Sequence, residues 1–333
     1  MSQLRVVFMG TPDFSVGIME KMLEQGIQLV GCVTVADKPA GRGQQLQESP
    51  VKRFAVAHSI PVLQPLKLKD EAFLADLRTF QADVFVVVAF RMLPVEVWKM
   101  PRFGTFNLHA SLLPDYRGAA PINWAIINGD QKTGVSTFFI DEAIDTGNVI
   151  AQTPMDIAEN ETAGSLHDRM MVTGGELVVE TIRAIESGMV KPIPQAQFKD
   201  SLMRPAPKLF RENTQIDWSK PVSEIHQLVC GLSPYPAAWT RWVNTKGEIK
   251  QVKLFSTTVG DRAIEHDVLI NPDGTINSDV TTNLHLSSDK HSIRVRCTDG
   301  ILVIHELQME GKKRMSAHDW LVGNSVSDWS VMD

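Results

Sequence analysis

The 333-residue chain lacks several features that would assign it to a specialised class of protein. No hydrophobic run approaches the roughly 18–20 residues that a membrane-spanning helix needs, so we expect no membrane attachment. The three cysteines, Cys32, Cys230 and Cys297, are too few and too scattered for a disulfide framework or a Cys-x-x-Cys metal site. The opening residues MSQLRVVFMG enter a strand pattern at once, with no signal peptide ahead of them. We therefore expect a reduced, cytoplasmic protein.

The sequence also lacks an excess of positive charge. Its net charge of −6 argues weakly against a constitutively basic nucleic-acid binder, although local patches rather than totals attract polyanions. His285, His291 and His305 lie at spacings that match no common zinc pattern, so we expect no metal. What is present, 43% hydrophobic and 22% charged residues, is ordinary for a globular protein. The length favours two domains.

The first half of the chain alternates between strand and helix patterns. The run DVFVVVAF is almost wholly apolar, as in a central parallel strand covered on both faces. Such alternation predicts a doubly wound α/β domain with a mostly parallel sheet, which we place at residues 1–189. The expected strands lie at 5–10, 29–35, 83–90, 103–111 and 135–141, and the expected helices at 14–26, 50–59, 70–81, 121–130 and 164–188.

The second half has a different character. Residues 190–206 are rich in proline and polar residues and are predicted to form a linker. In residues 207–333, strand patterns flank Lys246-Gly247 and Asp299-Gly300, and an Asp-Gly pair between such patterns is a strong hairpin signal. Consecutive hairpins without crossover helices predict a small β-barrel of the OB-like kind.

Polar residues of three types lie at or just beyond the ends of two expected strands. Asn107 and His109 are two residues apart, so their side chains share one face of a strand. The next strand ends in an acidic, turn-prone loop that contains Asp145. An imidazole that moves protons, an amide that donates to an oxyanion and a carboxylate that holds the imidazole suit acyl transfer to an amine. The alternative is a structural polar pair followed by an ordinary Asp-Thr-Gly turn.

A resemblance sharpens this interpretation. The segment HASLLPDYRGAAPINWAIINGD, followed by IDTG, closely resembles the signature of formyltransferases that use 10-formyltetrahydrofolate. The family has a doubly wound α/β domain, and its catalytic Asn, His and Asp fall on Asn107, His109 and Asp145. The resemblance also implies a folate pocket formed by two turns and an acidic loop. Its implied residues are Phe90, Arg91, Met92, Leu93, Ser111, Leu112, Leu113, Pro114 and Asp141.

Other segments are similar to the branch of this family that formylates methionyl-initiator tRNA. These are FMGTPDFS with ADKPAGRGQQLQESPVKRFA near the start, and IDWSKP, SPYPAAW and DGILVIHELQMEGKKRMSAHDWL in the second half. The resemblance implies that the glycine-flanked Arg42 enters the acceptor stem, since a guanidinium can fork onto phosphate or a base edge. The alternative for this loop is a solvated surface turn. The implied tRNA contacts are Lys38, Arg42, Lys52, Arg53, Lys312, Lys313 and Arg314.

Two rival functions stay open at this point. A formyltransferase that acts on an amino-sugar nucleotide would keep Asn107, His109 and Asp145 but would not need the Arg42 loop or the barrel. A non-catalytic folate- or nucleic-acid-binding protein would have no use for a proton-transferring histidine beside an oxyanion donor. Folate and methionyl-initiator tRNA are therefore the expected partners, without an obligate protein partner.

Overall fold

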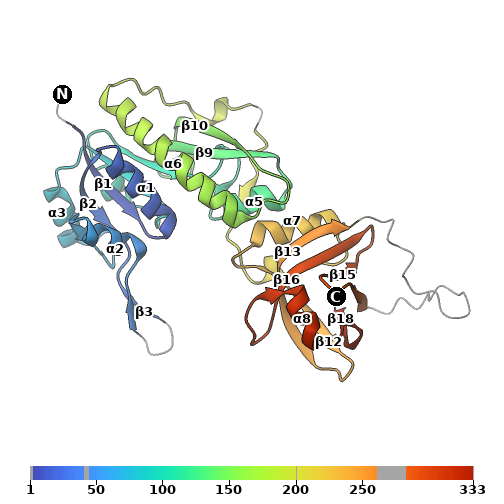
Figure 1. Ribbon diagram of the computed structural model, residues 1–333. Helices are drawn as coiled ribbons and strands as arrows, with labels where there is room; N and C mark the ends of the chain where they lie inside the picture. Colours follow the sequence, from blue (N-terminus) through green and yellow to red (C-terminus); the bar gives the residue numbers. More distant parts are fainter. Residues whose placement is uncertain (1–2, 41–44, 200, 261–282, 333) are drawn as a thin grey trace, which may run out of the picture. The chain divides into compact units, whose positions relative to one another are not determined.

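The computed structural model describes residues 3–40, 45–199, 201–260 and 283–332. The chain divides into two compact units, each with its own sheet (Figure 1). The first comprises Met1–Pro121, Lys132–Asp156 and Leu166–Pro207; the second comprises Ile122–Gln131, Ile157–Ser165 and Lys208–Asp333. Within the described part of the chain, no helix combines the length and the apolar character needed to cross a membrane.

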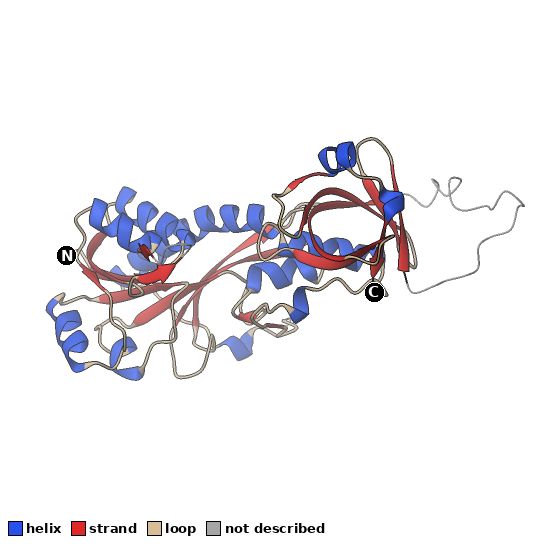
Figure 2. Ribbon diagram, turned by 90° about the horizontal axis from the view of Figure 1, so that it is seen from below, coloured by secondary structure: helices blue, strands red, loops and turns tan. Residues whose placement is uncertain are grey.

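The first unit is built on a seven-stranded sheet with the order β10-β9-β7-β6-β1-β2-β5. Its strands from β7 to β5 run parallel, whereas β9 and β10 are antiparallel. Helices cover both faces (Figure 2), which confirms the predicted doubly wound domain with a mostly parallel sheet. The strands are β1 (Arg5–Gly10), β2 (Gln28–Val33), β5 (Val62–Leu63), β6 (Val84–Val88), β7 (Thr105–His109), β9 (Lys132–Phe139) and β10 (Val149–Asp156).

Local sequence explains where several helices begin. The Ser49 hydroxyl accepts a hydrogen bond from the backbone N–H of Lys52, and Pro50 occupies the first helical position. The Asp70 carboxylate caps the next helix in the same way. The helices of this part of the chain are α1 (Asp13–Glu24), α2 (Pro50–Ala57), α3 (Glu71–Thr79), α4 (Val95–Trp98), α5 (Pro121–Ile127) and α6 (Ala163–Glu186).

The paired glycines inside α6 have a packing role. A Cβ atom on Gly174 would lie 2.8 Å from Cδ2 of Leu108 in β7, and one on Gly175 would lie 2.9 Å from Cβ of Lys21 in α1. Both distances are shorter than real Cβ contacts. The pair therefore lets α6 lie close to the sheet and to α1, despite the helix propensity that glycine costs.

The second unit is an antiparallel sheet with the order β13-β12-β18-β14-β15-β16-β17. An additional pairing of β13 with β16 closes the sheet on itself, and Figure 2 shows these strands curling into a barrel. The two predicted hairpins are confirmed as β12–β13 and β15–β16. The elements are α7 (Val222–Leu232), β12 (Ala238–Asn244), β13 (Ile249–Gly260), β14 (Asn283–Ser288), β15 (Ile293–Arg296), β16 (Ile301–Met309), β17 (Met315–Ser316), α8 (Ala317–Gly323) and β18 (Trp329–Met332).

Two short strand pairs in the first unit lie outside the large sheet. One is the hairpin of β3 (Lys38–Ala40) and β4 (Gln45–Gln47), in the segment expected to be a loop. The other joins β8 (Arg117–Gly118) to β11 (Pro205–Ala206) in parallel. The second pair brings the end of the predicted linker against the turn that follows β7. The domain boundaries 1–189, 190–206 and 207–333 stay a prediction.

Candidate active site

Asn107 and His109 lie in the last half of β7, between the neighbouring strands β6 and β9. His109 is buried and Asn107 is half-buried. The side-chain amide of Asn107 makes no hydrogen bond with another residue that the structure describes. Its two N–H donors are consequently available to a bound molecule.

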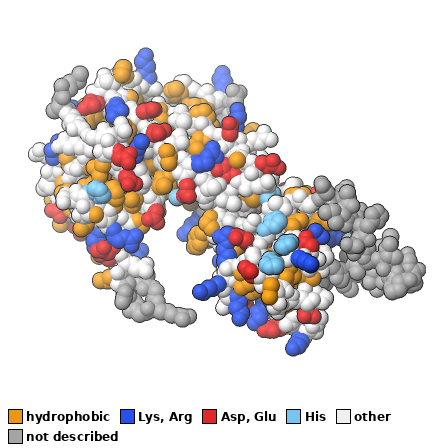
Figure 3. Space-filling model, in the orientation of Figure 1, with side chains coloured by type: hydrophobic (Ala, Val, Ile, Leu, Met, Phe, Trp, Pro, Cys, Tyr) orange, Lys and Arg blue, Asp and Glu red, His pale blue; other side chains and the backbone are white. Residues whose placement is uncertain are grey.

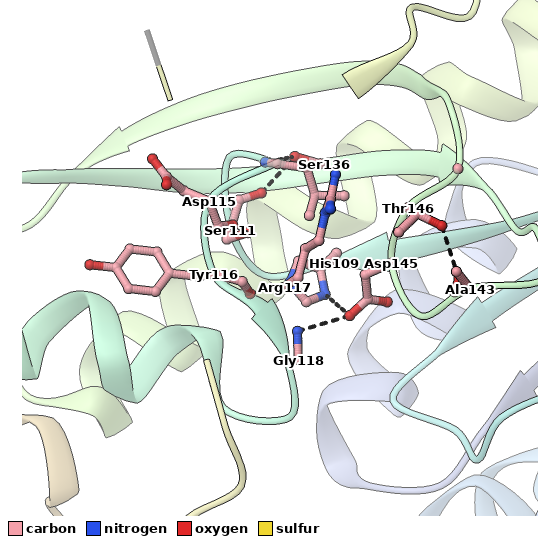
Figure 4. A network of polar contacts seen from close by, with 12 residues as sticks. His109, Ser111, Asp115, Tyr116, Arg117, Gly118, Ser136, Ala143, Asp145 and Thr146 are labelled. Atoms are coloured by element: carbon pink, nitrogen blue, oxygen red, sulfur yellow. Dashed lines mark hydrogen bonds and ion pairs between the residues drawn. The ribbon is translucent and has the colours of Figure 1, made fainter. Parts of the chain in front are cut away.

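The imidazole of His109 has a different partner at each nitrogen. Nε2 lies 2.8 Å from the carbonyl oxygen of Tyr116, and Nδ1 lies 3.9 Å from Oδ2 of Asp145. Figure 4 shows the ring of His109 and the carboxylate of Asp145 directed at each other. Because a carbonyl can only accept, Nε2 carries the proton in the neutral ring. Nδ1 is then the nitrogen with a free lone pair, and it faces the Asp145 carboxylate.

Asp145 is held in a tight turn. Its backbone has φ of +54°, and its Oδ2 accepts a hydrogen bond of 2.9 Å from the N–H of Gly118. At Gly147 a Cβ atom would stand 1.7 Å from the carbonyl oxygen of Phe139, so only glycine fits. The Asp-Thr-Gly sequence therefore forms a turn that also presents a carboxylate to His109 (Figure 4).

The turn that follows β7 is fixed to the neighbouring strands. The Ser136 hydroxyl in β9 donates to the carbonyl of Ser111 at 2.6 Å and accepts from the N–H of Leu113 at 3.0 Å. The Ser111 hydroxyl donates to the carbonyl of Asp115 at 2.6 Å. The predicted folate residues Ser111–Pro114 thus form a rigid turn that leads directly from His109 to Tyr116.

The other predicted folate residues serve their own loops. The Arg91 guanidinium donates to the carbonyls of Pro65 and Leu66, and burial lowers the pKa of this side chain. The carboxylate of Asp141 accepts from the N–H of Ala143 and from the hydroxyl of Thr146. Within the described ranges, no hydrogen bond joins the 90–93 turn to Asn107, His109 or Asp145. Met92 is exposed, Leu93 is buried, and Phe90 is half-buried.

The structure brings to this site two side chains that the sequence analysis missed, Gln195 and Arg117. Gln195 is buried, and its Nε2 donates to the carbonyls of Asp145 and Gly147, at 2.8 Å each. Its Oε1 accepts from Nε and a terminal nitrogen of Arg117, at 2.9 and 2.6 Å. Gln195 lies in the segment interpreted as a linker, where nothing in the local pattern distinguishes it.

The predicted tRNA-binding cations of the first unit differ in their surroundings. Arg42 lies outside the described residues. Lys38 and Arg53 are exposed. The ammonium group of Lys52 forms ion pairs with Asp37 and Glu48, and its hydrogen bond to Asp37 raises its pKa. Its charge is therefore partly neutralised within the protein.

In the second unit, Lys312 and Lys313 are exposed. The guanidinium of Arg314 binds the Glu306 carboxylate and lies 4.5 Å above the ring of Phe255. On the face drawn in Figure 3, acidic and basic side chains are interspersed over both units. No group of three or more His, Cys, Asp and Glu side chains that could hold a metal ion occurs among the residues with a described placement.

Comparisons with known proteins agree on one family. Residues 4–182 match the family described as Formyl transferase, and residues 208–325 match Formyl transferase, C-terminal domain. Methionyl-tRNA formyltransferase of Bacteroides thetaiotaomicron is 48% identical over 331 residues, which cover 99% of this chain and 98% of that protein. The Flavobacterium johnsoniae enzyme of the same name is 46% identical over 328 residues, 98% of each chain.

Solved structures share the fold at lower identity. HypX from Aquifex aeolicus in complex with tetrahydrofolic acid gives a TM-score of 0.60 at 18% identity, over 97% of this chain and 47% of HypX. WlaRD, a sugar 3N-formyl transferase, gives a TM-score of 0.61 at 18% identity, over 94% of this chain and 100% of its own. Fold, family profiles and full-length relatives all agree, and the chain belongs to the methionyl-tRNA formyltransferase family.

Proposed function

We propose that the protein transfers the formyl group of 10-formyltetrahydrofolate to the α-amino group of methionyl-initiator tRNA, in translation initiation in the cytoplasm. The single observation that carries the mechanism is the placement of His109 between the Tyr116 carbonyl and the Asp145 carboxylate, two residues from an amide without a hydrogen-bond partner among the described residues. The relatives that cover nearly the whole chain support this choice of acceptor.

His109 moves the protons in this proposal. The attacking amine must lose a proton and the leaving nitrogen of the folate must gain one, and both transfers use Nδ1. The carboxylate of Asp145, 3.9 Å away, orients the ring and stabilises the imidazolium that forms between the two transfers. The Tyr116 carbonyl fixes the tautomer from the other side. A positioned general acid–base typically contributes about 10²–10⁴-fold to the rate.

Asn107 stabilises the oxyanion that develops on the formyl group as the amine attacks. The amide is half-buried and commits neither N–H to the described part of the protein, so it breaks no internal hydrogen bond when it donates. Removing one such donor in comparable sites costs about 10²–10³-fold in kcat. No covalent enzyme intermediate is needed, because the nucleophile comes from the acceptor.

The remaining assignments concern the two substrates. Folate lies against the turns 90–93 and 111–114, with Asp141 in the loop beside it. Since Arg91 is bound to Pro65 and Leu66, the pterin is recognised through backbone groups of the 90–93 turn rather than through that guanidinium. The tRNA contacts Lys38, Arg42, Lys52 and Arg53 in the first unit, and Lys312, Lys313 and Arg314 in the second.

The acceptor is tested by offering the purified protein 10-formyltetrahydrofolate with three acceptors in parallel: methionyl-initiator tRNA, methionyl-elongator tRNA and an amino-sugar nucleotide. We expect formylation of the initiator tRNA alone. Formylation of only the sugar would keep the catalytic trio and overturn the assignment of the Arg42 loop and of the barrel. Binding of folate with no transfer to any acceptor would leave a binding protein.

A further inference from the structure

The three residues from Tyr116 to Gly118 contact both members of the catalytic pair. The carbonyl of Tyr116 binds His109, and the N–H of Gly118 binds the carboxylate of Asp145. The residue between them, Arg117, directs its side chain to Gln195 rather than to either catalytic group. Any shift of this short segment therefore moves the partners of His109 and Asp145 together.

Gln195 completes the connection from the opposite side. One end of its amide is held by two nitrogens of Arg117, and the other end donates to the backbone carbonyls of Asp145 and Gly147. Those carbonyls flank the turn whose left-handed residue is Asp145 itself. The side chain thus spans from the segment that binds His109 to the turn that presents the carboxylate. All four of its hydrogen bonds are between 2.6 and 2.9 Å.

A second support comes from β11, which pairs with β8. The N–H of Tyr116 donates to the carbonyl of Arg204 at 2.6 Å, and the N–H of Ala119 donates to the carbonyl of Ala206 at 2.8 Å. At Gly118, where φ is +126°, a Cβ atom would stand 2.4 Å from the same carbonyl of Ala206. The backbone of this turn therefore has little freedom of its own, and the Arg117 side chain links it to the Asp145 turn through Gln195.

We propose that Arg117 and Gln195 are positioning residues for formyl transfer, which set the distance between the Asp145 carboxylate and Nδ1 of His109. The inference rests on the proposed function, because it assigns Asp145 a part in the chemistry. Neither side chain touches the reacting atoms. Their contribution is to hold the turn at residues 145–147 and the segment 116–118 in one arrangement, so that the imidazolium formed on His109 always meets its carboxylate.

The arrangement favours this role over a purely structural one. Gln195 uses both its N–H donors on the turn that carries the Asp145 carboxylate. Gln152, a polar side chain of β10, instead donates to the carbonyl of Leu113. Displacing a catalytic group by about 1 Å can lower a rate by about 100-fold. We call the Arg117 and Gln195 side chains the clamp. Removing this clamp should therefore lower the rate of the chemical step without a matching decrease in substrate binding.

The test is a double-mutant cycle on single-turnover formylation of methionyl-initiator tRNA with saturating 10-formyltetrahydrofolate. The variants are Gln195→Leu, Asp145→Asn and the double variant, with folate affinity and melting temperature measured for each. We expect Gln195→Leu to lower the rate about 10–100-fold in the wild-type background, and by less than about 3-fold once Asp145 is replaced, because coupled residues are non-additive.

Gln195→Glu separates the two ends of the clamp and serves if Gln195→Leu does not fold. It keeps an oxygen for Arg117 but removes both N–H donors to the carbonyls of Asp145 and Gly147. We expect the same rate decrease in the same cycle.

Thr181→Val is the matched control, because it removes a buried hydroxyl that binds Thr137 and the carbonyl of Leu177 in the same unit. It should lower the melting temperature and leave the rate within about 2-fold, since it touches neither catalytic group.

The outcomes separate the inference from the function on which it rests. An equal rate decrease for Gln195→Leu with and without Asp145, or an effect confined to the melting temperature, would overturn the positioning role. If Asp145→Asn alone leaves the rate unchanged, the role given to Asp145 under the proposed function fails first. A slow Asp145→Asn variant beside a Gln195 variant of normal rate contradicts only the clamp.

Discussion

Two buried histidines, one in each unit, show how the same side chain serves different ends. His109 is 6% exposed and His226 is 8% exposed, so burial does not distinguish them, whereas their partners do. His109 gives one nitrogen to a carbonyl and keeps the other 3.9 Å from a carboxylate. His226, in α7, binds Oγ1 of Thr257 at 2.9 Å and Oδ1 of Asn160 at 2.8 Å, both uncharged.

The difference lies in what each environment does to the charged ring. Around His226, burial lowers the pKa, and neither partner carries a charge that could stabilise imidazolium. That ring is a neutral crosslink between α7, β13 and Asn160. Around His109, a carboxylate oxygen of Asp145 lies 3.9 Å from Nδ1, and this nitrogen has no partner within hydrogen-bonding distance among the described residues. A histidine that moves protons needs a nitrogen that is not already committed.

The largest effect that would sharpen this comparison is expected for His109→Ala. The variant should show a single-turnover rate about 10²–10⁴-fold lower, since general acid–base catalysis is worth that much. Its affinity for 10-formyltetrahydrofolate should stay within about 3-fold, because the proposed folate contacts belong to the turns 90–93 and 111–114. Rapid-quench kinetics and fluorescence titration measure the two quantities. A parallel decrease in folate affinity would mean that His109 contributes to ground-state binding instead.

His226→Ala should show the opposite behaviour. It leaves the Thr257 hydroxyl and the Asn160 amide without their partner and opens a cavity, which should cost about 1–3 kcal/mol of unfolding free energy. The rate of formyl transfer on saturating substrates should change by less than about 2-fold, since His226 contacts neither His109 nor Asp145. Thr257→Val, which removes only one of the two hydrogen bonds, should cost less. Denaturant unfolding measures these differences.

The lowered pKa of His226 also predicts a pH dependence of stability. Below pH 6.5 the unfolded chain binds a proton at this residue that the folded chain does not, so the unfolding free energy falls as the pH drops from 6.5 towards the lowered pKa. The slope for one such group is at most about 1.4 kcal/mol per pH unit. Above pH 6.5 the ring is neutral in both the folded and the unfolded chain, so this decrease in the unfolding free energy is absent. His226→Ala should flatten the profile in that window, and an unchanged slope would place the titrating group elsewhere.

The smallest effect concerns the exposed cations. Replacing Lys312 and Lys313 by Ala should lower kcat/KM for methionyl-initiator tRNA only a few-fold. It should also reduce the log–log dependence of kcat/KM on salt by about one unit for each phosphate that the protein no longer neutralises. Lys290→Ala, at another exposed position of the same unit, is the control. An unchanged salt slope in the double variant would remove the Lys312–Lys313 pair from the tRNA surface.

Much of this architecture could be predicted because its signals are local. The apolar runs of β1 and β6 and the Asp-Gly turn between β15 and β16 are evident from neighbouring residues. Asn107 and His109 belong to one strand, Asp145 lies in the loop that ends the next, and the family signature matches all three. Ser49 and Asp70 mark helix starts through hydrogen bonds to residues two or three positions away.

The missed features depend on contacts between distant parts of the chain. The carbonyl that fixes His109 belongs to the backbone of Tyr116, and a backbone group has no signature in sequence. Gln195 acts on residues 50 and 78 positions earlier in the chain. The glycines of α6 look unfavourable until Leu108 and Lys21 are seen beside them. In each case the residue is explained by its neighbours in space, which the local pattern does not contain.

The central claim, that His109 transfers protons through the nitrogen facing Asp145, is tested most directly by chemical rescue. His109→Gly would be assayed in single turnover with increasing imidazole, and with substituted imidazoles of different pKa. The account predicts a low basal rate that rises with imidazole concentration and varies with the pKa of the added base. A basal rate close to that of the unaltered protein, or a low rate that no imidazole restores although it is shown to occupy the site, would contradict it.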